Sequence, residues 1–530
     1  MITILRSNSF HDISSMISEK ERKNFMYCKV MSAVLKGLKT EFVCVETDIQ
    51  NGLPMLHMVG CLASEVKESG ERIKAAAKNM GMGIPAKKII VNLAPAWVRK
   101  SGAAFDLPIG VSILGALMEI PKENLENVLI LGELGLDGSV RPMRGLLPMV
   151  LHAKTQGVKT CVIPHGNLKE GKMAEGMRLI GVSSLKETIE FLKEGRVPRH
   201  RTARKKEKKE KCIPDFSDIK GQRTLKRAAE VAVCGGHNML MVGPPGAGKT
   251  MIAKRMAGIL PKMGEQEKLE IMKIYSVLGL LDEMEGEEQR PFREVHHTIT
   301  KAALIGGGIV PKPGELSLAN GGILFLDELA EFQRGVLEVL RQPLEERQIR
   351  LVRNSGNYVF PADCIVVAAT NACPCGNFPD LSACTCTPSQ RRNYFGRISQ
   401  PFLSRIDICV EAPKIQFKDI SADGQEETSA LIRKRIEKAR EIQEKRFGNK
   451  SMVNAKMGIK EIERFCIMDG EAKDCLKEAY TALGLTPRLY HKILRVARTI
   501  ADLKGDEKIK RIQIREALGY RVMEQRNWRE

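Results

Sequence analysis

The sequence lacks any long hydrophobic run. No stretch reaches the roughly 18 uninterrupted apolar residues that a membrane-spanning helix needs. The first thirty residues are polar and charged, whereas a signal peptide would carry an apolar segment there. These two absences predict a protein that stays in the cytoplasm and has no membrane partner.

Acidic residues are also in deficit. The chain has 64 Asp and Glu against 84 Lys and Arg, which gives a formal net charge of +20. Such an excess is unusual for an enzyme that handles only small molecules. It favours a polyanionic partner such as DNA, because each phosphate neutralised by Lys or Arg releases condensed counterions. The alternative is a solvated basic surface without a partner.

Disulfides are not expected, although the chain has 14 cysteines. In a large chain without an export signal, the default is reduced thiols and, in some cases, a metal site. Ten of the cysteines are scattered singly and are expected to pack as small buried hydrophobic residues.

A chain of 530 residues is expected to form about two to four domains. Short β-branched runs, such as those at 87–93 and 161–164, alternate with helical segments in the first part and predict an α/β domain. Strands, glycine-rich turns and helices then alternate, which predicts a mainly parallel sheet. The last part has apolar residues at helical spacing only. We therefore predict an extension of uncertain order at 1–24, an N-terminal α/β domain at 25–195, a basic linker at 196–215, an α/β core with a parallel sheet at 216–413 and an all-α domain at 414–530.

A phosphate-binding loop is the strongest motif. The segment 238–250 reads NMLMVGPPGAGKT, an apolar strand followed by G-x-x-x-x-G-K-T and then a helical segment. Glycines allow successive backbone N–H groups to surround phosphates, and the helix adds its positive end. Lys249 is expected to reach the β- and γ-phosphates of ATP, and Thr250 to bind Mg²⁺. The predicted loop consists of Gly243, Pro244, Pro245, Gly246, Ala247, Gly248, Lys249 and Thr250.

Two further strands end in polar side chains that fit the same site. The run ILFLDE places Asp327 and Glu328 at the end of a buried strand. There Asp327 is expected to bind Mg²⁺, and Glu328 to polarise the attacking water. The strand IVVAAT at 365–370 precedes Asn371, which is suited to orienting that water.

Four cysteines follow Asn371 in the pattern C-x-C, eight residues, C-x-C. Cys373, Cys375, Cys384 and Cys386 lie within fourteen residues of sequence. Four thiolates at such spacing can surround one tetrahedral Zn²⁺, so we predict a structural zinc site. Four free thiols are the main alternative. The adjacent histidines His296 and His297 are expected to be structural, because neighbouring side chains point to different faces.

These motifs resemble the AAA+ ATPases, and within them the magnesium-chelatase-like family often called YifB or ComM. The resemblance spans roughly residues 26 to 522. It implies that Arg405, in SRID, is an arginine finger that acts on the nucleotide of a neighbouring subunit, and that Arg488, in TPR, is a sensor on the helical lid. A finger acting in trans implies a ring, and such motors are usually homo-hexamers. An ion pair of Arg405 with Asp407 or Glu411 is the alternative. The sequence segments that show the resemblance are NLAPAWVRKSGAAFDLPIG (92–110), GPPGAGKT (243–250), PFREVHHTITKAALIGGG (291–308), GGILFLDELAEFQRGVLEVLRQPLE (321–345) and LRVARTIADL (494–503).

Residues 131–164 resemble the proteolytic domain of Lon, and KSGAAFD at 100–106 falls where Lon carries its nucleophilic serine. A Ser–Lys dyad needs a hydroxyl and an amine within hydrogen-bond reach. Here Ala104 takes the place of the serine and Leu147 that of the lysine, while Ser101 and Lys154 are displaced in sequence. The N-terminal domain is therefore expected to be proteolytically inactive.

Two segments are candidates for DNA contact. The run ERQIRLVRNSGNYVF at 346–360 predicts a hairpin. Related ring motors carry a basic residue on such a hairpin in the pore, so Arg350 and Arg353 are the candidates here. The glycine-rich segment 301–313 is expected to form a second, mobile pore loop with Lys301 and Lys312. Surface salt bridges are the alternative for both pairs.

The resemblance implies a hexameric DNA motor, such as a helicase or branch-migration factor used in recombination or natural transformation. A chelatase-type motor that remodels a partner protein for metal insertion is the second hypothesis, and the Lon-like domain and the cysteine cluster are taken to argue against it. An ATP-dependent Lon-type protease is the third, disfavoured by Ala104 and Leu147.

Overall fold

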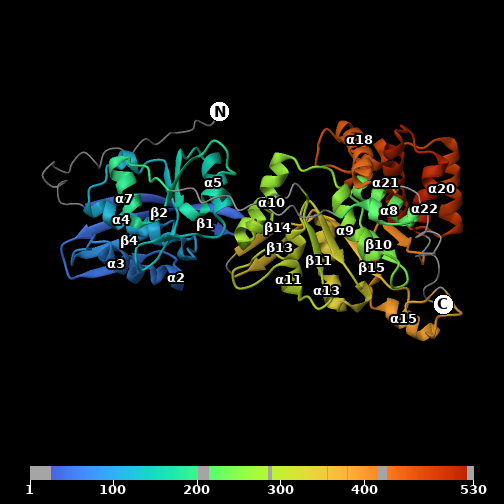
Figure 1. The fold of residues 1–530 in the computed structure, drawn as a ribbon, viewed down its shortest axis with the longest axis horizontal. Coiled ribbons are helices and arrows are strands. Elements are labelled where there is room, and N and C mark those ends of the chain that lie inside the picture. Colours follow the sequence, from blue (N-terminus) through green and yellow to red (C-terminus); the bar gives the residue numbers. More distant parts are fainter. Residues whose placement is uncertain are drawn as a thin grey trace, which may run out of the picture. The chain divides into compact units, whose positions relative to one another are not determined.

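A computed structural model describes residues 26–200, 214–284, 289–354, 356–378, 380–414 and 426–521. The predicted extension at 1–24 lies outside these residues, as do positions 201–213 of the predicted basic linker. The chain divides into two compact units, which are coloured along the sequence in Figure 1 and are described separately below. The first unit comprises Met1–Lys205 and Ser276–Asp282, and the second comprises Lys206–Tyr275 and Glu283–Glu530.

The first unit contains a seven-stranded mixed sheet in the order β3-β4-β2-β1-β5-β8-β9. β2 pairs antiparallel with β1 and β4, whereas β5, β8 and β9 run parallel. The strands predicted at 87–93 and 161–164 correspond to β4 and β8. The strands of this unit are β1 (Met26–Lys36), β2 (Lys39–Gln50), β3 (Met55–Val59), β4 (Lys88–Ala94), β5 (Val128–Ile130), β6 (Glu133–Leu134), β7 (Val140–Arg141), β8 (Thr160–Pro164) and β9 (Arg178–Val182).

Helix α4 lies at the centre of this unit. Its residues from Asp106 to Ala116 are all buried, as expected for a helix that is apolar on every side. It shares one core with β1, β2 and α7, so the N-terminal region is a mixed α/β domain as predicted. The helices of the unit are α2 (Ser64–Lys67), α3 (Ser69–Asn79), α4 (Asp106–Leu117), α5 (Leu146–Thr155), α6 (Leu168–Gly171) and α7 (Leu185–Glu194).

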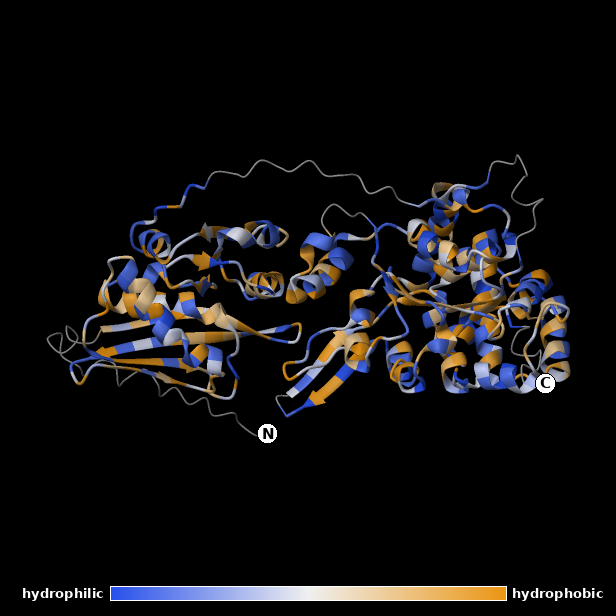
Figure 2. Ribbon diagram, turned by 60° about the horizontal axis from the view of Figure 1, so that its bottom comes forward, coloured by the Kyte–Doolittle hydropathy of each residue, from blue (hydrophilic) through white to orange (hydrophobic). Residues whose placement is uncertain are grey.

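The second unit is built on a five-stranded sheet in the order β11-β12-β15-β10-β16, in which every neighbouring pair is parallel. All residues of β10, β12 and β15 are buried, which matches the continuous apolar runs of their sequences. Figure 2 shows these apolar strands with helices on both sides. The strands are β10 (Met239–Val242), β11 (Phe292–Val295), β12 (Ile323–Leu326), β15 (Ile365–Thr370) and β16 (Ile408–Glu411).

The C-terminal helices α18 and α21 pack against α8 and α9. Met239 and Met241 of β10 belong to the same hydrophobic core as Ile432 of α18 and Ile493 of α21. No helix among the described residues is both long and apolar enough to cross a membrane. The helices of the second unit, with α10 ending in residues assigned to the first, are α8 (Arg223–Gly235), α9 (Lys249–Ile259), α10 (Glu265–Leu278), α11 (Lys301–Ile305), α12 (Glu315–Leu318), α13 (Arg334–Glu338), α14 (Arg341–Glu346), α15 (Pro388–Gly396), α16 (Gln400–Leu403), α18 (Ser429–Phe447), α19 (Ile459–Phe465), α20 (Gly470–Ala482), α21 (Pro487–Lys504) and α22 (Arg511–Gly519).

Two segments interrupt the alternation of strands and helices. The predicted hairpin is present as β13 (Gln348–Arg353) and β14 (Gly356–Pro361), which pair antiparallel. The second segment differs from the prediction of a mobile loop over 301–313, because its first residues form helix α11, which Thr300 caps. The remainder is closed by two backbone hydrogen bonds of 3.0 and 3.2 Å between Gly307 and Lys312, so that only a short tip with Ile309, 91% exposed, projects.

Candidate nucleotide site

The predicted phosphate loop connects β10 to α9. Gly246 and Gly248 have φ angles of +76° and +81°, a region that favours glycine. Gly243 is required for a different reason, since a Cβ atom there would lie 2.2 Å from the carbonyl oxygen of Ala412. The helix begins at Lys249, so its free N–H groups face the loop. This geometry is that of an anion-binding loop.

The amine of Lys249 lies within this loop. It donates to the carbonyl oxygens of Gly243 at 2.7 Å and Pro244 at 2.9 Å, and to Oδ1 of Asn371 at 3.1 Å. Burial lowers the pKa of Lys249, and the charge of Asp327 acts in the opposite direction. Asn371 directly follows β15, which neighbours β10 in the sheet. Lys249 of the loop and Asn371 are therefore in contact.

Thr250 and Asp327 also meet, although 77 residues separate them. The Thr250 hydroxyl donates to Oδ2 of Asp327 at 2.8 Å, and Oδ1 of Asp327 accepts a hydrogen bond from the Glu328 backbone N–H at 2.9 Å. A hydroxyl and a carboxylate are oxygen ligands of the kind that Mg²⁺ prefers, so these two residues fit a Mg²⁺ site.

Glu328 has an unusual backbone. Its φ angle is +53°, which is uncommon for a residue other than glycine and is concentrated at functional sites. Its side chain is 60% exposed, and Oε2 lies 3.4 Å from Nδ1 of His297. This carboxylate faces solvent at the carboxyl end of β12, where a water molecule can reach it.

His297 is a neighbour of the site that was expected to be structural. Its Nδ1 is close to Glu328 but not in hydrogen-bonding geometry, so this buried nitrogen has no hydrogen-bond partner among the described residues. Its ring lies against that of Phe332. The pairing of the two strands explains why His297 lies beside Glu328, because Val295 of β11 pairs with Leu326 of β12. His297 and Glu328 each follow their strand by two residues, so both reach the same edge of the sheet.

Arg405 and Arg488 lie apart from these contacts and converge on a single carboxylate, Glu345. Arg405 Nη2 is 2.9 Å from Glu345 Oε1, and Nη2 of Arg488 donates to the same oxygen. The Arg405 side chain is 10% exposed, and burial lowers its pKa while Glu345 opposes that shift. Arg405 thus pairs with Glu345, and the proposed partner Asp407 pairs with Lys492 instead. Sequence reasoning missed Glu345.

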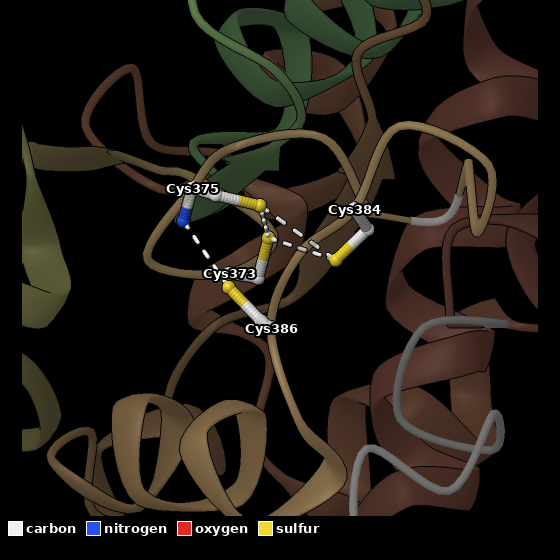
Figure 3. A group of neighbouring side chains, drawn as sticks. All are labelled: Cys373, Cys375, Cys384 and Cys386. Atoms are coloured by element: carbon white, nitrogen blue, oxygen red, sulfur yellow. Dashed lines mark hydrogen bonds between the residues drawn. The ribbon is translucent and has the colours of Figure 1, made fainter.

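The four cysteines after Asn371 form one cluster, with the Sγ atoms directed toward one another (Figure 3). Cys373 Sγ lies 3.3 Å from Cys375 Sγ and 3.8 Å from Cys384 Sγ. Backbone N–H groups of Phe378 and Cys375 donate to Cys373 Sγ and Cys386 Sγ, both at 3.4 Å. Four thiolates about 2.3 Å from one tetrahedral Zn²⁺ would be about 3.8 Å apart. The cluster therefore fits one zinc ion.

The four predicted DNA contacts lie on exposed surface. Arg350 forms an ion pair with Glu346, with Nε 3.4 Å from the carboxylate. Arg353 donates to the neighbouring carbonyl oxygen of Val352, at 3.1 Å, and forms no ion pair with a described residue. Within the described ranges, Lys301 and Lys312 form no ion pair. Among the described residues, Arg350 is the one of these four that forms an ion pair, and that pair is a weak surface contact. The salt-bridge alternative therefore applies to Arg350.

The Lon-like region has no Ser–Lys dyad in the described part of the chain. Leu147 is buried in α5, and Ala104 lies in the short 3-10 turn Ala103–Phe105. No hydrogen bond joins Ser101 to Lys154, which is exposed. The amine of Lys100, adjacent to Ser101, instead donates to the carbonyl oxygen of Pro95.

The parallel sheet, its glycine loop and the polar residues at three strand ends define an ATPase of the AAA+ class. Sequence profiles narrow this to one family. The profile described as "Magnesium chelatase, subunit ChlI" matches residues 215–420, and its C-terminal counterpart matches 426–521. A further profile, "Subunit ChlI of Mg-chelatase", matches residues 45–167.

The chain belongs to the magnesium-chelatase-like family of ComM and YifB. It is 39% identical to the competence protein ComM of Haemophilus influenzae over 499 residues, 93% of this chain and 97% of that protein. It is 37% identical to YifB of Salmonella typhimurium over 489 residues, 92% of this chain and 96% of YifB. Lon protease 2 of Bacillus subtilis is 29% identical over 128 residues, 24% of this chain and 23% of that protease, in the N-terminal region. Family membership implies ATP hydrolysis with Mg²⁺.

Proposed function

We propose that this protein is an ATP-driven motor that acts on single-stranded or branched DNA in the cytoplasm, as a ring of six copies. Its role would be that of a helicase or branch-migration factor in recombination or natural transformation. The observation that carries the ATPase part is the convergence of Lys249, Thr250, Asp327 and Asn371 at adjacent strand ends. The net charge of +20 and the name of the ComM relative as a competence protein support the DNA part.

Within the proposed site, each side chain has one task. Lys249 binds the β- and γ-phosphates, and Thr250 and Asp327 hold Mg²⁺, which neutralises charge on the phosphates. The exposed carboxylate of Glu328 accepts a hydrogen bond from the attacking water, and Asn371 orients that water. Arg405 and Arg488 complete the site from the neighbouring copy. Their separation from the loop and their shared contact with Glu345 support this assignment in trans.

The cysteine cluster is proposed to hold structural Zn²⁺. Besides the separations of the sulfur atoms, the backbone N–H groups that donate to Cys373 Sγ and Cys386 Sγ support thiolates of the kind that zinc requires. Metal analysis of the purified protein tests this proposal. About one equivalent of zinc is expected, and less than about half an equivalent would count against it.

The N-terminal unit is proposed to serve as a scaffold without protease activity, because neither Ala104 nor Leu147 can act in a Ser–Lys dyad. ATP-dependent degradation of casein that is lost on Ser101→Ala would overturn this. The alternative of a chelatase-type motor regains some weight here. A profile described as a subunit of Mg-chelatase matches residues 45–167, so the Lon-like region does not argue against that alternative.

The decisive experiment measures ATPase activity with and without forked DNA, together with a branch-migration assay. Stimulation by forked DNA and ATP-dependent movement of the branch are expected. Stimulation by a partner protein, with none by DNA, would favour the chelatase-type motor instead.

A further inference from the structure

A cationic cavity lies in the second unit, beside the predicted arginine finger. Its volume is about 720 Å³, and its walls come from β10, β16, α15, α16 and the first turns of α21. Ser404, which precedes Arg405, is part of the wall. No acidic residue is among the described residues that line the cavity. The cationic residues are Arg334, Arg392, Arg488, Lys492 and Arg521.

Three of these five charges have partners within the protein. Lys492 pairs with Asp407 at 3.0 Å, and Arg488 pairs with Glu345. Arg521 donates to the carbonyl oxygens of Ile406 and Asp407. These side chains therefore have local reasons to be where they are.

Arg334 and Arg392 differ from the other three. Both are exposed, and neither forms an ion pair or a hydrogen bond with another described residue. They also line a second cavity of about 550 Å³, so they stand where the two cavities adjoin. Single exposed arginines are common on surfaces. Arg334 lies near Glu338 of its own helix without forming an ion pair with it, and Glu331 in the second cavity pairs with Arg397. Two arginines without an ion pair beside a first cavity that lacks acidic groups leave positive charge that an anion can neutralise.

The size and chemistry of the cavity suit a phosphate-bearing ligand. Guanidinium groups bind phosphate oxygens through paired N–H donors, and about 300–1,000 Å³ is the usual size of a small-molecule pocket. The protein's own phosphate loop is served by Lys249 and Asn371, which contact neither arginine. The cavity is instead linked to the predicted finger, because Arg488 in its wall shares Glu345 with Arg405.

We propose that Arg334 and Arg392 contact the triphosphate of the nucleotide held by the neighbouring copy, as further catalytic residues beside Arg405. This proposal depends on the proposed ring. During hydrolysis, water adds to the γ-phosphorus as the bond from the γ-phosphorus to the bridging oxygen breaks, which gives ADP and phosphate. The arginines stay protonated throughout and stabilise the negative charge that builds on the phosphoryl oxygens.

The first test is the double variant Arg334→Ala/Arg392→Ala in the full chain. Its ATPase rate should fall at least about tenfold, a smaller loss than the roughly 10³–10⁵ expected for a principal arginine finger. Binding of a fluorescent ATP analogue to its own loop should stay within about twofold of the unchanged protein, because a trans residue contributes little to that affinity. Arg515→Ala is the matched control, since Arg515 is an exposed arginine of α22 that lines neither cavity.

Arg334→Lys/Arg392→Lys retains both charges and should recover part of the rate, which a loss of folding would not allow. An unchanged rate in the alanine double variant overturns the proposal. Unchanged basal ATPase with weakened DNA binding also overturns it and assigns the cavity to DNA.

A mixing experiment distinguishes action in trans from action in cis. The alanine double variant is mixed with Lys249→Ala, each being nearly inactive alone. In mixed rings about a quarter of the interfaces pair an intact loop with intact arginines, so up to about a quarter of the activity should return. No recovery would mean that Arg334 and Arg392 act within their own subunit or only support the fold.

The same mixture made with Arg405→Ala tests the ring itself. Recovery with Arg405→Ala but not with the double variant would reject this inference and leave the proposed ring intact. Failure of both mixtures would reject the ring.

Discussion

Gly376 packs directly against Pro245, so the cysteine loop touches the phosphate loop. A Cβ atom at Gly376 would lie 2.5 Å from Cδ of Pro245, and the φ angle of Gly376 is +81°. Because Gly376 directly follows Cys375, the position of the cysteine cluster is coupled to that of the phosphate loop. Asn371, two residues before Cys373, is coupled to the same loop through Lys249.

Gly376→Ala should therefore weaken nucleotide binding while zinc is retained. The added methyl group must displace Pro245 or the cysteine loop, and overpacking of such a contact costs about 1–3 kcal/mol. We expect the affinity for a fluorescent ATP analogue to fall about tenfold. Gly470→Ala in α20 is the control, because no atom lies within 4 Å of a Cβ placed there. Normal affinity in Gly376→Ala would show that the two loops move independently.

Lys249 and Arg405 should separate binding from turnover. Lys249→Ala removes the amine that is held inside the loop and should weaken both nucleotide binding and hydrolysis. Arg405→Ala should leave binding intact and reduce hydrolysis by about 10³-fold or more, since an arginine in trans contributes about 10³–10⁵ to the rate. Nucleotide titration and steady-state ATPase assays measure the two effects. If Arg405→Ala hydrolyses ATP normally, the ring loses its main support.

Arg350 and Arg353 should matter only when DNA is present. Both are exposed residues of β13 in the hairpin, and neither contacts the nucleotide site in the described residues. Arg350→Ala/Arg353→Ala should keep the basal ATPase rate and abolish its stimulation by DNA. The slope of log affinity against log salt should become shallower by roughly 1.4–1.8, the value for two lost phosphate contacts. Arg511→Ala serves as the control on α22, and unchanged stimulation in the hairpin variant would place the DNA contact elsewhere.

The core of the nucleotide site was accessible from the sequence because its parts are local. Asp327 and Asn371 directly follow apolar strands, and Lys249 ends the glycine loop that follows a third. The carboxyl ends of these parallel strands meet at one edge of the sheet. The contact of Thr250 with Asp327 is a consequence of that rule. The cysteine cluster was accessible for the same reason, since its four thiols lie within one short segment.

Contacts between distant elements left no such pattern. Glu345 meets Arg405 and Arg488 from a different helix, 143 residues from the latter, and nothing near it in sequence marks it. His297 was assigned a structural role because adjacent side chains diverge, although the register of β11 and β12 places it beside Glu328. The glycines at 306–308 suggested a mobile loop over 301–313, but the Thr300 cap and the bridge between Gly307 and Lys312 order most of that segment.

Asp407 and Lys492 form a buried ion pair that should make the second unit sensitive to acid. Their side chains are 13% and 7% exposed, and the pair joins the segment of Arg405 to α21, which carries Arg488. Burial alone would raise the pKa of Asp407, but the charge of Lys492 and the nearby His237 ring, 3.6 Å away, outweigh it, so the pKa is lowered. A carboxyl group with a lowered pKa in the folded state stabilises the fold above its ordinary pKa of about 3.9. That contribution is lost as the pH falls below about 4, toward the folded pKa.

Asp407→Asn should thus reduce the free energy of unfolding at pH 7 by about 3–5 kcal/mol, because Lys492 is left buried without a counter-charge. Urea unfolding of the variant and the unchanged protein at pH 7 and near pH 3 measures the effect. The difference in unfolding free energy between the two proteins cancels the contributions of the carboxylates they share. This difference should be smaller at the lower pH. Asp407→Asn/Lys492→Met removes both charges and should recover most of the stability. A difference that stays constant between the two pH values would mean that Asp407 acts through its hydrogen bonds and not through its charge.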